Sequence, residues 1–307
     1  MSKGLNLAQL QAVHYTQGAC LVLAGAGSGK TRVITHKIAH LIDQRGLAPQ
    51  RIAAITFTNK AAAEMRERAA GLIGRRAKDL LLCTFHALGV RLLRADGQRL
   101  GLKPQFSILD SDDVLSILKD AAGGTTDAAT ARQWQWALSR WKNMGLNAAQ
   151  ALAQASNEEE QQLARIMARY EERLAAYQSV DFDDLIGLPL KLLREYPEVR
   201  DKWQTQLGYV LVDEYQDTNA TQYELLKLLV GARGHFTAVG DDDQSIYGWR
   251  GATLDNLKRL PQDFPQLKVI KLEQNYRSTS AIMRAANNVI GPNPKLFPKT
   301  LFSELGE

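Results

Sequence analysis

The stretch Cys20-Leu21-Val22-Leu23-Ala24-Gly25-Ala26-Gly27-Ser28-Gly29-Lys30-Thr31 decides the fold of this chain. Its apolar opening, residues 20–23, has no polar alternation and predicts a strand that is buried on both faces. The glycines that follow allow a tight turn in which backbone N–H groups can approach a bound phosphate closely. A helical pattern starts at the end of the stretch. The sequence therefore predicts a strand, a phosphate-binding turn and a helix in direct succession.

The turn of residues 24–31 resembles the Walker A pattern of nucleotide-binding proteins. The general pattern begins with glycine, and Ala24 takes that place here. We expect the Lys30 ammonium to reach the β and γ phosphates of ATP and the Thr31 hydroxyl to bind Mg²⁺. The expected ATP contacts of this region are Ala24, Gly25, Ala26, Gly27, Ser28, Gly29, Lys30, Thr31 and Arg32.

A second apolar run ends in two adjacent carboxylates, in the segment Val210-Leu211-Val212-Asp213-Glu214. Hydrolysis of ATP needs an acidic group that holds Mg²⁺ opposite Thr31 and a base that orients the attacking water. We assign the first role to Asp213 and the second to Glu214. Together with the phosphate-binding turn, this pair predicts an ATPase with ATP and Mg²⁺ as cofactors.

Similar apolar, β-branched runs recur along the chain, and most are followed by polar or small residues and a helical pattern. Intervening helices and strands without polar alternation are typical of a doubly wound α/β fold, whose ligands bind beyond the carboxyl ends of a parallel sheet. The expected strands are residues 20–23, 52–57, 80–85, 209–212, 236–239 and 269–272.

The region from about residue 88 to residue 196 breaks this rhythm. Its periodicity predicts successive amphipathic helices, separated in one place by a Gly-Gly-Thr-Thr linker at residues 123–126. We interpret the region as an all-helical insertion into the α/β domain. Examples of the expected helices are residues 112–122, 131–142, 158–177 and 183–195.

Further polar segments stand in a characteristic order at residues 56–60, 84–86, 215–218, 239–252 and 274–278. With the two nucleotide motifs, they resemble the ordered motifs of superfamily 1 DNA helicases of the UvrD, PcrA and Rep type, with the greatest similarity to the Rep branch. The resemblance spans nearly the whole chain. It implies a RecA-like P-loop NTPase sheet with an inserted helical subdomain, and ATP-driven movement on single-stranded DNA from 3′ toward 5′.

This resemblance also implies the limits of the domains and the extent of the motor. Residues 1–87 and 197–273 would form the first, ATP-binding motor domain, residues 88–196 the helical insertion, and residues 274–307 the start of a second motor domain. The rest of that domain is absent from the chain. We therefore expect an N-terminal fragment that binds ATP and single-stranded DNA or duplex junctions but is catalytically impaired and does not unwind.

One loop combines residues suited to both ligands. The amide of Gln244 could hydrogen-bond the γ phosphate or the attacking water without adding negative charge beside Asp213 and Glu214. A few residues later, aromatic side chains alternate with a cation, which suits stacking on unpaired bases and a phosphate contact. The DNA-binding candidates of this loop are Tyr247, Trp249 and Arg250.

The remaining site residues are assigned by the resemblance. Gln9 matches a position that reads the adenine edge, Tyr276 a position that stacks near adenine, and Arg277 a position that approaches the γ phosphate. The expected catalytic set is Lys30, Asp213, Glu214, Gln244 and Arg277. Further DNA contacts are expected at Phe57, Thr58, Asn59, Lys60, Thr84, Phe85 and His86.

Charge and composition agree with these assignments. The chain carries 38 basic and 33 acidic residues, a net charge of +5, and residues 51–78 alone have seven basic residues against two acidic ones. Such a local excess fits a phosphate-backbone footprint, although a solvated helix face is the alternative. Two cysteines within apolar runs, no secretion signal and no long apolar stretch predict a cytoplasmic protein without a structural metal and without a membrane partner.

Two other classes of protein share a phosphate-binding turn. A P-loop kinase is disfavoured because no lid-like cluster of arginines follows, and the loop of residues 244–250 would have no role. A non-motor nucleic-acid-binding module is disfavoured because both nucleotide motifs keep their lysine, hydroxyl and carboxylates.

Overall fold

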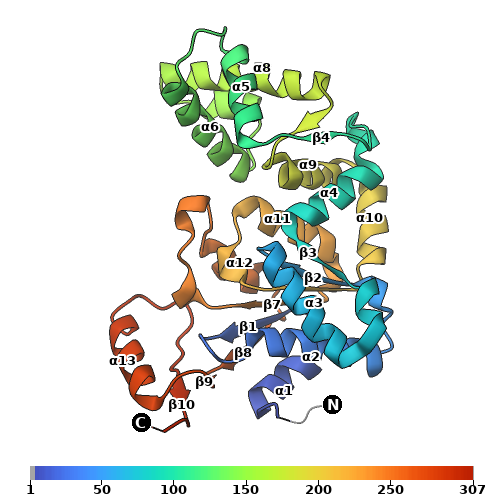
Figure 1. Ribbon diagram of the computed structural model, residues 1–307, viewed down its shortest axis with the longest axis vertical. Coiled ribbons are helices and arrows are strands. Elements are labelled where there is room, and N and C mark those ends of the chain that lie inside the picture. The colour runs from blue at the N-terminus through green and yellow to red at the C-terminus, as the bar shows by residue number, and fades with distance from the viewer. Residues whose placement is uncertain (1–3, 307) are drawn as a thin grey trace. The chain divides into compact units, whose positions relative to one another are not determined.

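The computed structural model describes residues 4–306, which form two compact units (Figure 1). The first unit contains the described residues up to Thr84, together with Lys202–Thr218 and the residues from Leu229 onward. The second contains Phe85–Asp201 and Asn219–Leu228. Residues 274–306 therefore lie in the first unit, while the domain limits expected from the sequence stay predictions. Residues 1–3 and 307, which the expected domains include, lie outside the described residues.

A six-stranded parallel sheet, in the order β3-β2-β6-β7-β1-β8, is the centre of the first unit (Figure 1). All six expected strands are present, and the expected α/β class is confirmed. The four inner strands are buried along their whole length, whereas the edge strand β8 exposes Lys268 and Lys271. Charged side chains on an edge discourage pairing with another chain. The strands are β1 (Cys20–Ala24), β2 (Ile52–Thr56), β3 (Leu81–Thr84), β6 (Tyr209–Val212), β7 (Phe236–Gly240) and β8 (Lys268–Leu272).

Helices and short turns complete the first unit. The α-helices are α1 (Leu7–His14), α2 (Lys30–Asp43), α3 (Asn59–Ile73), α12 (Asp255–Asp263) and α13 (Ser280–Ile290), and a two-stranded pair joins β9 (Gln274–Asn275) to β10 (Phe302–Ser303). The 3₁₀ turns are η1 (Pro49–Arg51), η2 (Gly74–Asp79), η4 (Tyr215–Asp217), η5 (Gly231–Arg233), η6 (Asp242–Gln244) and η7 (Gly248–Arg250).

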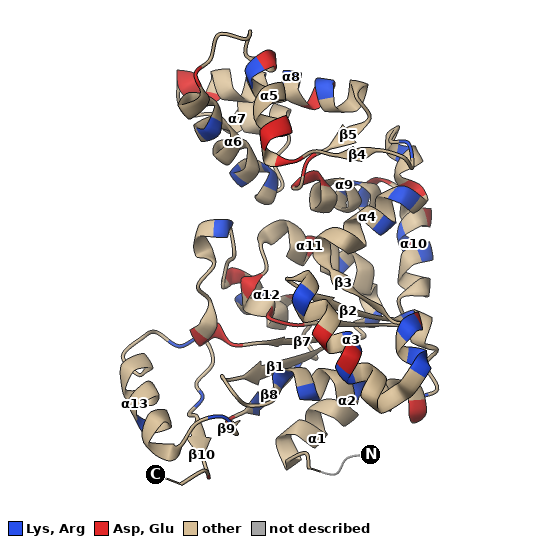
Figure 2. Ribbon diagram, viewed as in Figure 1, with Lys and Arg blue, Asp and Glu red and all other residues tan. Residues whose placement is uncertain are grey.

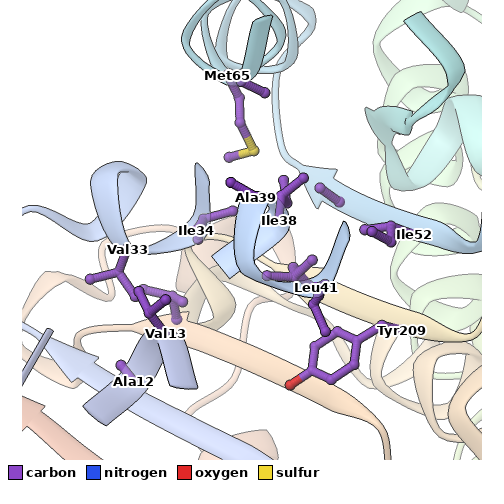
Figure 3. Packing of buried hydrophobic residues seen from close by; sticks show 14 of the residues in the cluster. Ala12, Val13, Val33, Ile34, Ile38, Ala39, Leu41, Ile52, Met65 and Tyr209 are labelled. Atoms are coloured by element: carbon purple, nitrogen blue, oxygen red, sulfur yellow. The ribbon is translucent and has the colours of Figure 1, made fainter. Parts of the chain in front are cut away.

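The core of the first unit lies where helices α1, α2 and α3 meet the sheet, and Figure 3 shows its packing. Val13 of α1 and Ile34 and Ile38 of α2 are almost fully buried. Each such side chain stabilises the fold by about 1.5–3 kcal/mol relative to an exposed position. The apolar face of α2 fixes the helix against the strands, and therefore fixes the turn that precedes it.

A buried lysine joins α1 to α2. Lys37 is fully buried, and its Nζ donates to the carbonyl oxygens of Ala12 and Tyr15 at the end of α1. These carbonyls have no acceptor role within the helix, so the ammonium caps them. Burial lowers the pKa of Lys37 to about 8, although Cys20 opposes this shift. The charge therefore costs free energy while it holds the two helices together.

The second unit is mainly helical. Its elements are α4 (Phe85–Asp96), η3 (Gly97–Leu100), β4 (Ser107–Ile108), α5 (Ser111–Ala121), α6 (Ala128–Asn143), α7 (Ala148–Gln154), α8 (Glu158–Ala176), β5 (Ser179–Val180) and α9 (Asp184–Glu195), while α10 (Pro197–Gln206) and α11 (Ala220–Val230) extend past its limits. The four expected helices correspond to α5, α6, α8 and α9. The helices α4, α7 and α10 and the β4–β5 pair were not named in advance, and of these α7 and the β4–β5 pair are too short to show a clear period.

An ion-pair network lies inside this second unit. The Nζ of Lys142 is 2.6 Å from Asp181 Oδ2 and 2.8 Å from Asp184 Oδ1, and the hydroxyl of Tyr170 donates to Asp181. Removal of one member would leave a buried charge without its partner, which is strongly destabilising. Among residues 4–306, no helix is long and apolar enough to cross a membrane.

The buried Lys37 predicts an unusual pH dependence of stability. Its pKa of about 8 in the folded chain lies below the value of 10.5 for a free lysine, so between pH 8 and 10.5 the unfolded chain binds more protons. The free energy of unfolding should therefore gain up to about 3 kcal/mol from this group as pH rises through that window. Urea titrations of the wild type and Lys37→Met at pH 7 and pH 9.5 test this. Equal pH dependence in the two proteins would refute it.

Candidate functional site

The turn between β1 and α2 is shaped by glycines and by a side chain from α1. Gly29 has a φ of 87°, in the left-handed region, and a Cβ there would lie 2.8 Å from Gln9 Nε2. Helix α2 begins directly after it at Lys30. The first-turn N–H groups of a helix have no acceptors within the helix and carry its positive dipole, so they attract anions. The expected phosphate-binding turn thus has the geometry of an anion site.

Three of the expected catalytic residues lie together at this turn. The Nζ of Lys30 is 2.9 Å from Glu214 Oε2 and donates to Gln244 Oε1 at 3.2 Å. They meet because β1, β7 and β6 are neighbours in the sheet and their carboxyl ends share one edge. Glu214 follows β6 in the left-handed conformation (φ 48°, ψ 45°), which costs about 1–2 kcal/mol for a residue with a side chain. Such strained residues cluster at functional sites.

Two further carboxyl groups make this edge of the sheet strongly acidic. Burial, and then the charge of Glu214, raise the pKa of Asp213 to about 6 and that of Asp217 to about 6, while Lys30 opposes both shifts. Asp217 Oδ1 is buried and has no hydrogen-bond partner among the described residues. Carboxylate and hydroxyl oxygens are hard ligands that suit Mg²⁺. The excess of acid over the single ammonium of Lys30 therefore fits the expected cation, with Thr31 and Asp213 as its ligands.

Gln216 contributes to this site, although the sequence analysis gave it no role. Its Nε2 donates to Glu214 Oε2 at 2.8 Å, and its Oε1 accepts from the backbone N–H of Asp241 at 3.0 Å. Gln216 therefore ties the end of β6 to the end of β7. A Cβ on Gly240 would lie 2.7 Å from Gln216 Oε1, so this close approach requires glycine. The sequence feature that could have indicated this role is the position of Gln216 in the segment of residues 215–218, directly after the Asp213-Glu214 pair.

The residues expected near adenine are linked by Asn6. Gln9 is buried, its Nε2 donates to the carbonyl oxygen of Ser28 at 2.9 Å, and its Oε1 accepts from the Asn6 N–H at 3.0 Å. Both polar ends of Gln9 are therefore engaged with the protein, and adenine reading would require these bonds to exchange. The side chain of Asn6 donates to the hydroxyl of Tyr276 at 2.8 Å. Gln9 and Tyr276 thus lie at the two ends of one short hydrogen-bond chain.

The two arginines assigned to ATP differ in their surroundings. Arg277 follows Tyr276, whose N–H donates to the carbonyl oxygen of Gly27 at 3.0 Å, and a Cβ on Gly27 would lie 2.8 Å from the Arg277 Cβ. The base of Arg277 is therefore beside the phosphate-binding turn. Arg32 is exposed on α2, with its guanidinium beside Gly4.

The expected DNA contacts after β2 and β3 are unequally exposed. Thr58 caps α3 through its hydroxyl, which accepts from the Ala61 N–H at 3.0 Å, and Thr58, Asn59 and Lys60 are exposed, with Phe57 half-buried. Thr84 is buried at the end of β3. These residues belong to the first unit.

Phe85 and His86 belong to the second unit. Phe85 is only 1% exposed, which does not support the expected DNA contact, because a buried ring offers no surface for a base. His86 lies against Phe182, with ring centroids 4.5 Å apart, and burial lowers the pKa of its imidazole. We therefore expect His86 to be neutral at pH 7.

The basic excess of residues 51–78 is partly structural. Arg66 donates to the carbonyl oxygens of Ala77 and Leu82, and Arg76 pairs with Asp43 at 2.8 Å. These two guanidinium groups hold the protein backbone or a carboxylate. Figure 2 shows basic and acidic residues side by side on α3. The exposed basic residues that stay available for phosphate contacts include Lys60, Arg68, Arg75 and Lys78.

The aromatic residues of the loop after β7 lie on the surface. Trp249 is 75% exposed, and Tyr247 is also exposed, with the two ring centroids 6.4 Å apart. The guanidinium carbon of Arg250 lies 5.1 Å from the Tyr247 centroid and 4.5 Å from the Trp249 centroid. Exposed aromatic side chains beside a cation form a surface on which unpaired bases can stack. A core-packing role for Trp249 is excluded by its exposure.

Comparison with known proteins identifies the family. The UvrD/REP helicase N-terminal domain matches residues 5–265. This chain belongs to that family. It is 53% identical over 305 residues to the ATP-dependent DNA helicase Rep of Escherichia coli (strain K12), covering 98% of this chain and 45% of the relative. It is 43% identical over 302 residues to the ATP-dependent DNA helicase PcrA of Staphylococcus aureus (strain Mu50), covering 97% of this chain and 41% of the relative.

Membership of the UvrD/REP family confirms the resemblance drawn from the ordered motifs. The chain spans less than half the length of these two relatives. Within the family, the roles assigned above to individual residues of this chain stay predictions, and the contacts of Lys30, Glu214 and Gln244 give them a structural basis.

The site predicts different effects for two substitutions. Lys30→Ala should weaken Mg-ATP binding about 10- to 100-fold, because a charged hydrogen bond to phosphate is worth about 1.5–3 kcal/mol. Glu214→Gln should leave the affinity unchanged or improve it, because it removes the carboxylate that holds Lys30 at 2.9 Å. Calorimetry with Mg-ATP measures both, with Lys78→Ala as a control for an exposed charge. Equal losses in the two variants would contradict this division of roles.

Proposed function

We propose that this chain is the ATP-binding part of a DNA motor. One observation carries the proposal: a single loop reaches both ligand surfaces. Gln244 contacts the phosphate-turn residue Lys30 at 3.2 Å, and five residues later Trp249 is 75% exposed beside Arg250. A change in the bound nucleotide that moves Gln244 would therefore also move the base-stacking surface, because both belong to one short segment.

The site residues divide the work of hydrolysis. Lys30 Nζ lies 2.9 Å from Glu214 Oε2, and a bound γ phosphate would compete with Glu214 for this ammonium. Glu214 would then be free to accept a proton from the attacking water, with Gln216 holding its Oε2. Bound Mg²⁺, held by Thr31 and Asp213, would neutralise phosphate charge. Arg277, whose Cβ lies beside Gly27 of the turn, would approach the γ phosphate.

The names of the relatives support the wider proposal. The similar Rep and PcrA proteins are named ATP-dependent DNA helicases. We extend this to the present chain as ATP-dependent translocation on single-stranded DNA from 3′ toward 5′, with duplex junctions as further substrates. The corresponding domains would be residues 1–87 with 197–273, the insertion at 88–196, and the start of a second motor domain at 274–307.

An ATPase assay with and without single-stranded DNA separates this proposal from its alternatives. Stimulation by DNA would support the motor. Transfer of phosphate to a small acceptor would instead support a kinase. Turnover without any response to DNA would support a non-motor ATPase module, because its nucleotide and nucleic-acid surfaces would not be coupled.

The aromatic surface predicts the character of DNA binding. Trp249→Ala should weaken binding of single-stranded DNA by about 1–3 kcal/mol with little dependence on base sequence, as expected for stacking. Lys60→Ala should instead reduce the magnitude of the slope of log affinity against log salt by about 0.7, the value for one phosphate contact. Fluorescence anisotropy with oligonucleotides at several salt concentrations measures both. An unchanged slope would remove Lys60 from the DNA path.

We also predict that this chain alone binds Mg-ATP and single-stranded DNA but does not unwind a duplex. A motor of this kind works by closing two domains around one nucleotide, and we propose that residues 274–307 supply only the start of the second. Loss of the arginine contribution to phosphoryl transfer costs about 10³–10⁵ in rate in other NTPases. Strand displacement on a duplex with a 3′ single-stranded tail is the test. ATP-dependent unwinding at rates typical of a complete helicase would overturn the prediction.

A further inference from the structure

A lysine far along the chain lies among the acidic residues after β7. The side chain of Lys299 is 2% exposed, and its Nζ is 2.7 Å from a carboxylate oxygen of each of Asp241, Asp242 and Asp243. Burial alone would lower the pKa of Lys299, but the hydrogen bonds that its ammonium donates to the three carboxylates raise the pKa well above its usual value. Among the described residues, these carboxylates form the one group of three or more His, Cys, Asp or Glu side chains whose ligand atoms lie close enough together to hold a metal ion. The Lys299 ammonium supplies the positive charge that balances these carboxylates.

Asp241 divides its two oxygens between this lysine and the nucleotide site. Its Oδ1 pairs with Lys299 and also accepts from the Asp243 N–H at 3.1 Å, and its Oδ2 accepts from Gln244 Nε2 at 2.5 Å. The other end of the Gln244 amide, Oε1, accepts from Lys30 Nζ at 3.2 Å. Consecutive contacts therefore run from Lys299 through Asp241 and Gln244 to the lysine of the phosphate-binding turn.

The direction of the Gln244 amide follows from this arrangement. Because Nε2 donates to Asp241, the group directed toward Lys30 is the acceptor oxygen. An amide oxygen accepts a hydrogen bond from water, whereas a γ phosphate needs a donor. The fixed amide is thus suited to orient the attacking water.

The segment that carries Lys299 is anchored at several points. The backbone N–H groups of Leu296 and Phe297 donate to Asp242 Oδ2 at 3.2 and 3.4 Å. Leu301 packs on the phosphate-binding turn so closely that a Cβ on Gly25 would lie 2.2 Å from its Cδ2. Figure 2 shows the acidic patch at the end of β7 with a basic segment beside it. The backbone that carries Lys299 is therefore fixed next to the three carboxylates.

We infer that Lys299 is a positioning residue, which holds Asp241 so that the Gln244 amide keeps its oxygen directed into the nucleotide site. Without the ammonium, three neighbouring carboxylates would repel one another, and only the Asp243 N–H would still hold Asp241 Oδ1 against that repulsion. Gln244 could then rotate and direct either end toward Lys30. The role of Gln244 toward ATP rests on the proposed function, but its orientation by Lys299 does not.

The first test follows the Gln244 side chain in the chain without nucleotide. In ¹H–¹⁵N spectra, its amide protons, assigned by comparison with Gln244→Ala, should exchange slowly with solvent in the wild type and in Lys299→Arg. In Lys299→Met, exchange should accelerate at least about tenfold, because the carboxylate acceptor then loses its ammonium partner. Lys268→Met, which removes an exposed lysine of the edge strand β8, is the control for loss of a lysine charge. Unchanged exchange in a folded Lys299→Met would overturn the inference.

The second test separates positioning from binding. In single-turnover hydrolysis, Lys299→Met should lower the rate by about 10- to 100-fold, the scale of a misplaced reacting group, while Mg-ATP affinity changes less than twofold. Lys299→Arg should restore most of the rate. Combined with Gln244→Ala, Lys299→Met should add no further loss, because both act through one group. Full additivity of the two losses would contradict the assigned route through Gln244.

Two outcomes distinguish this inference from the proposed function. If the wild type binds no Mg-ATP while the amide exchange responds to Lys299→Met, the proposed function fails and the positioning role stands. If ATP binds but neither exchange nor rate responds, the positioning role fails alone. Should Lys299→Met prevent folding, Lys299→Gln replaces it, because it keeps a hydrogen-bond donor without the charge.

Discussion

The attraction between the Lys30 ammonium and the carboxylates around it is the interaction on which the acidic edge of the sheet depends. Asp213, Glu214 and Asp217 lie near it, and two of them have their pKa raised to about 6 even with this lysine present. Parallel strands direct these groups to one edge of the sheet. There the charge on one carboxylate raises the free energy of ionising the next. The ammonium of Lys30 therefore offsets part of this repulsion, and the arrangement of the site should respond to a cation or phosphate that binds there.

Much of the fold could be predicted from the sequence, because the apolar runs in the sequence are the segments that the structure buries. The six strands of the sheet are short apolar runs whose ends differ from prediction by at most one residue. The helix α7 and the β4–β5 pair escaped prediction, because a seven-residue helix and two-residue strands carry almost no periodic signal. The long helices of the second unit were predictable because their apolar faces recur over several turns.

The residues of the site likewise fall into those that a contiguous motif predicts and those that depend on contacts between distant segments. The phosphate-binding turn and the Asp213-Glu214 pair are contiguous motifs, so spacing alone indicated them. The roles of Gln216 and Lys299 depend on contacts across 25 and 57 residues, which no spacing reveals. Phe85 shows a different limit: the family resemblance placed it among the DNA contacts, and the fold buries its ring.

The strand order has a consequence for synthesis of the chain. Strand β1 pairs only with β7 and β8, which begin more than 200 residues later. At about 5–20 residues per second on the ribosome, β1 waits on the order of 10 to 40 seconds for its first neighbour. During that interval an apolar strand and the glycine turn behind it have both edges unpaired, which exposes the nascent chain to aggregation. Protection by a chaperone would matter most in this interval, before the nucleotide site exists.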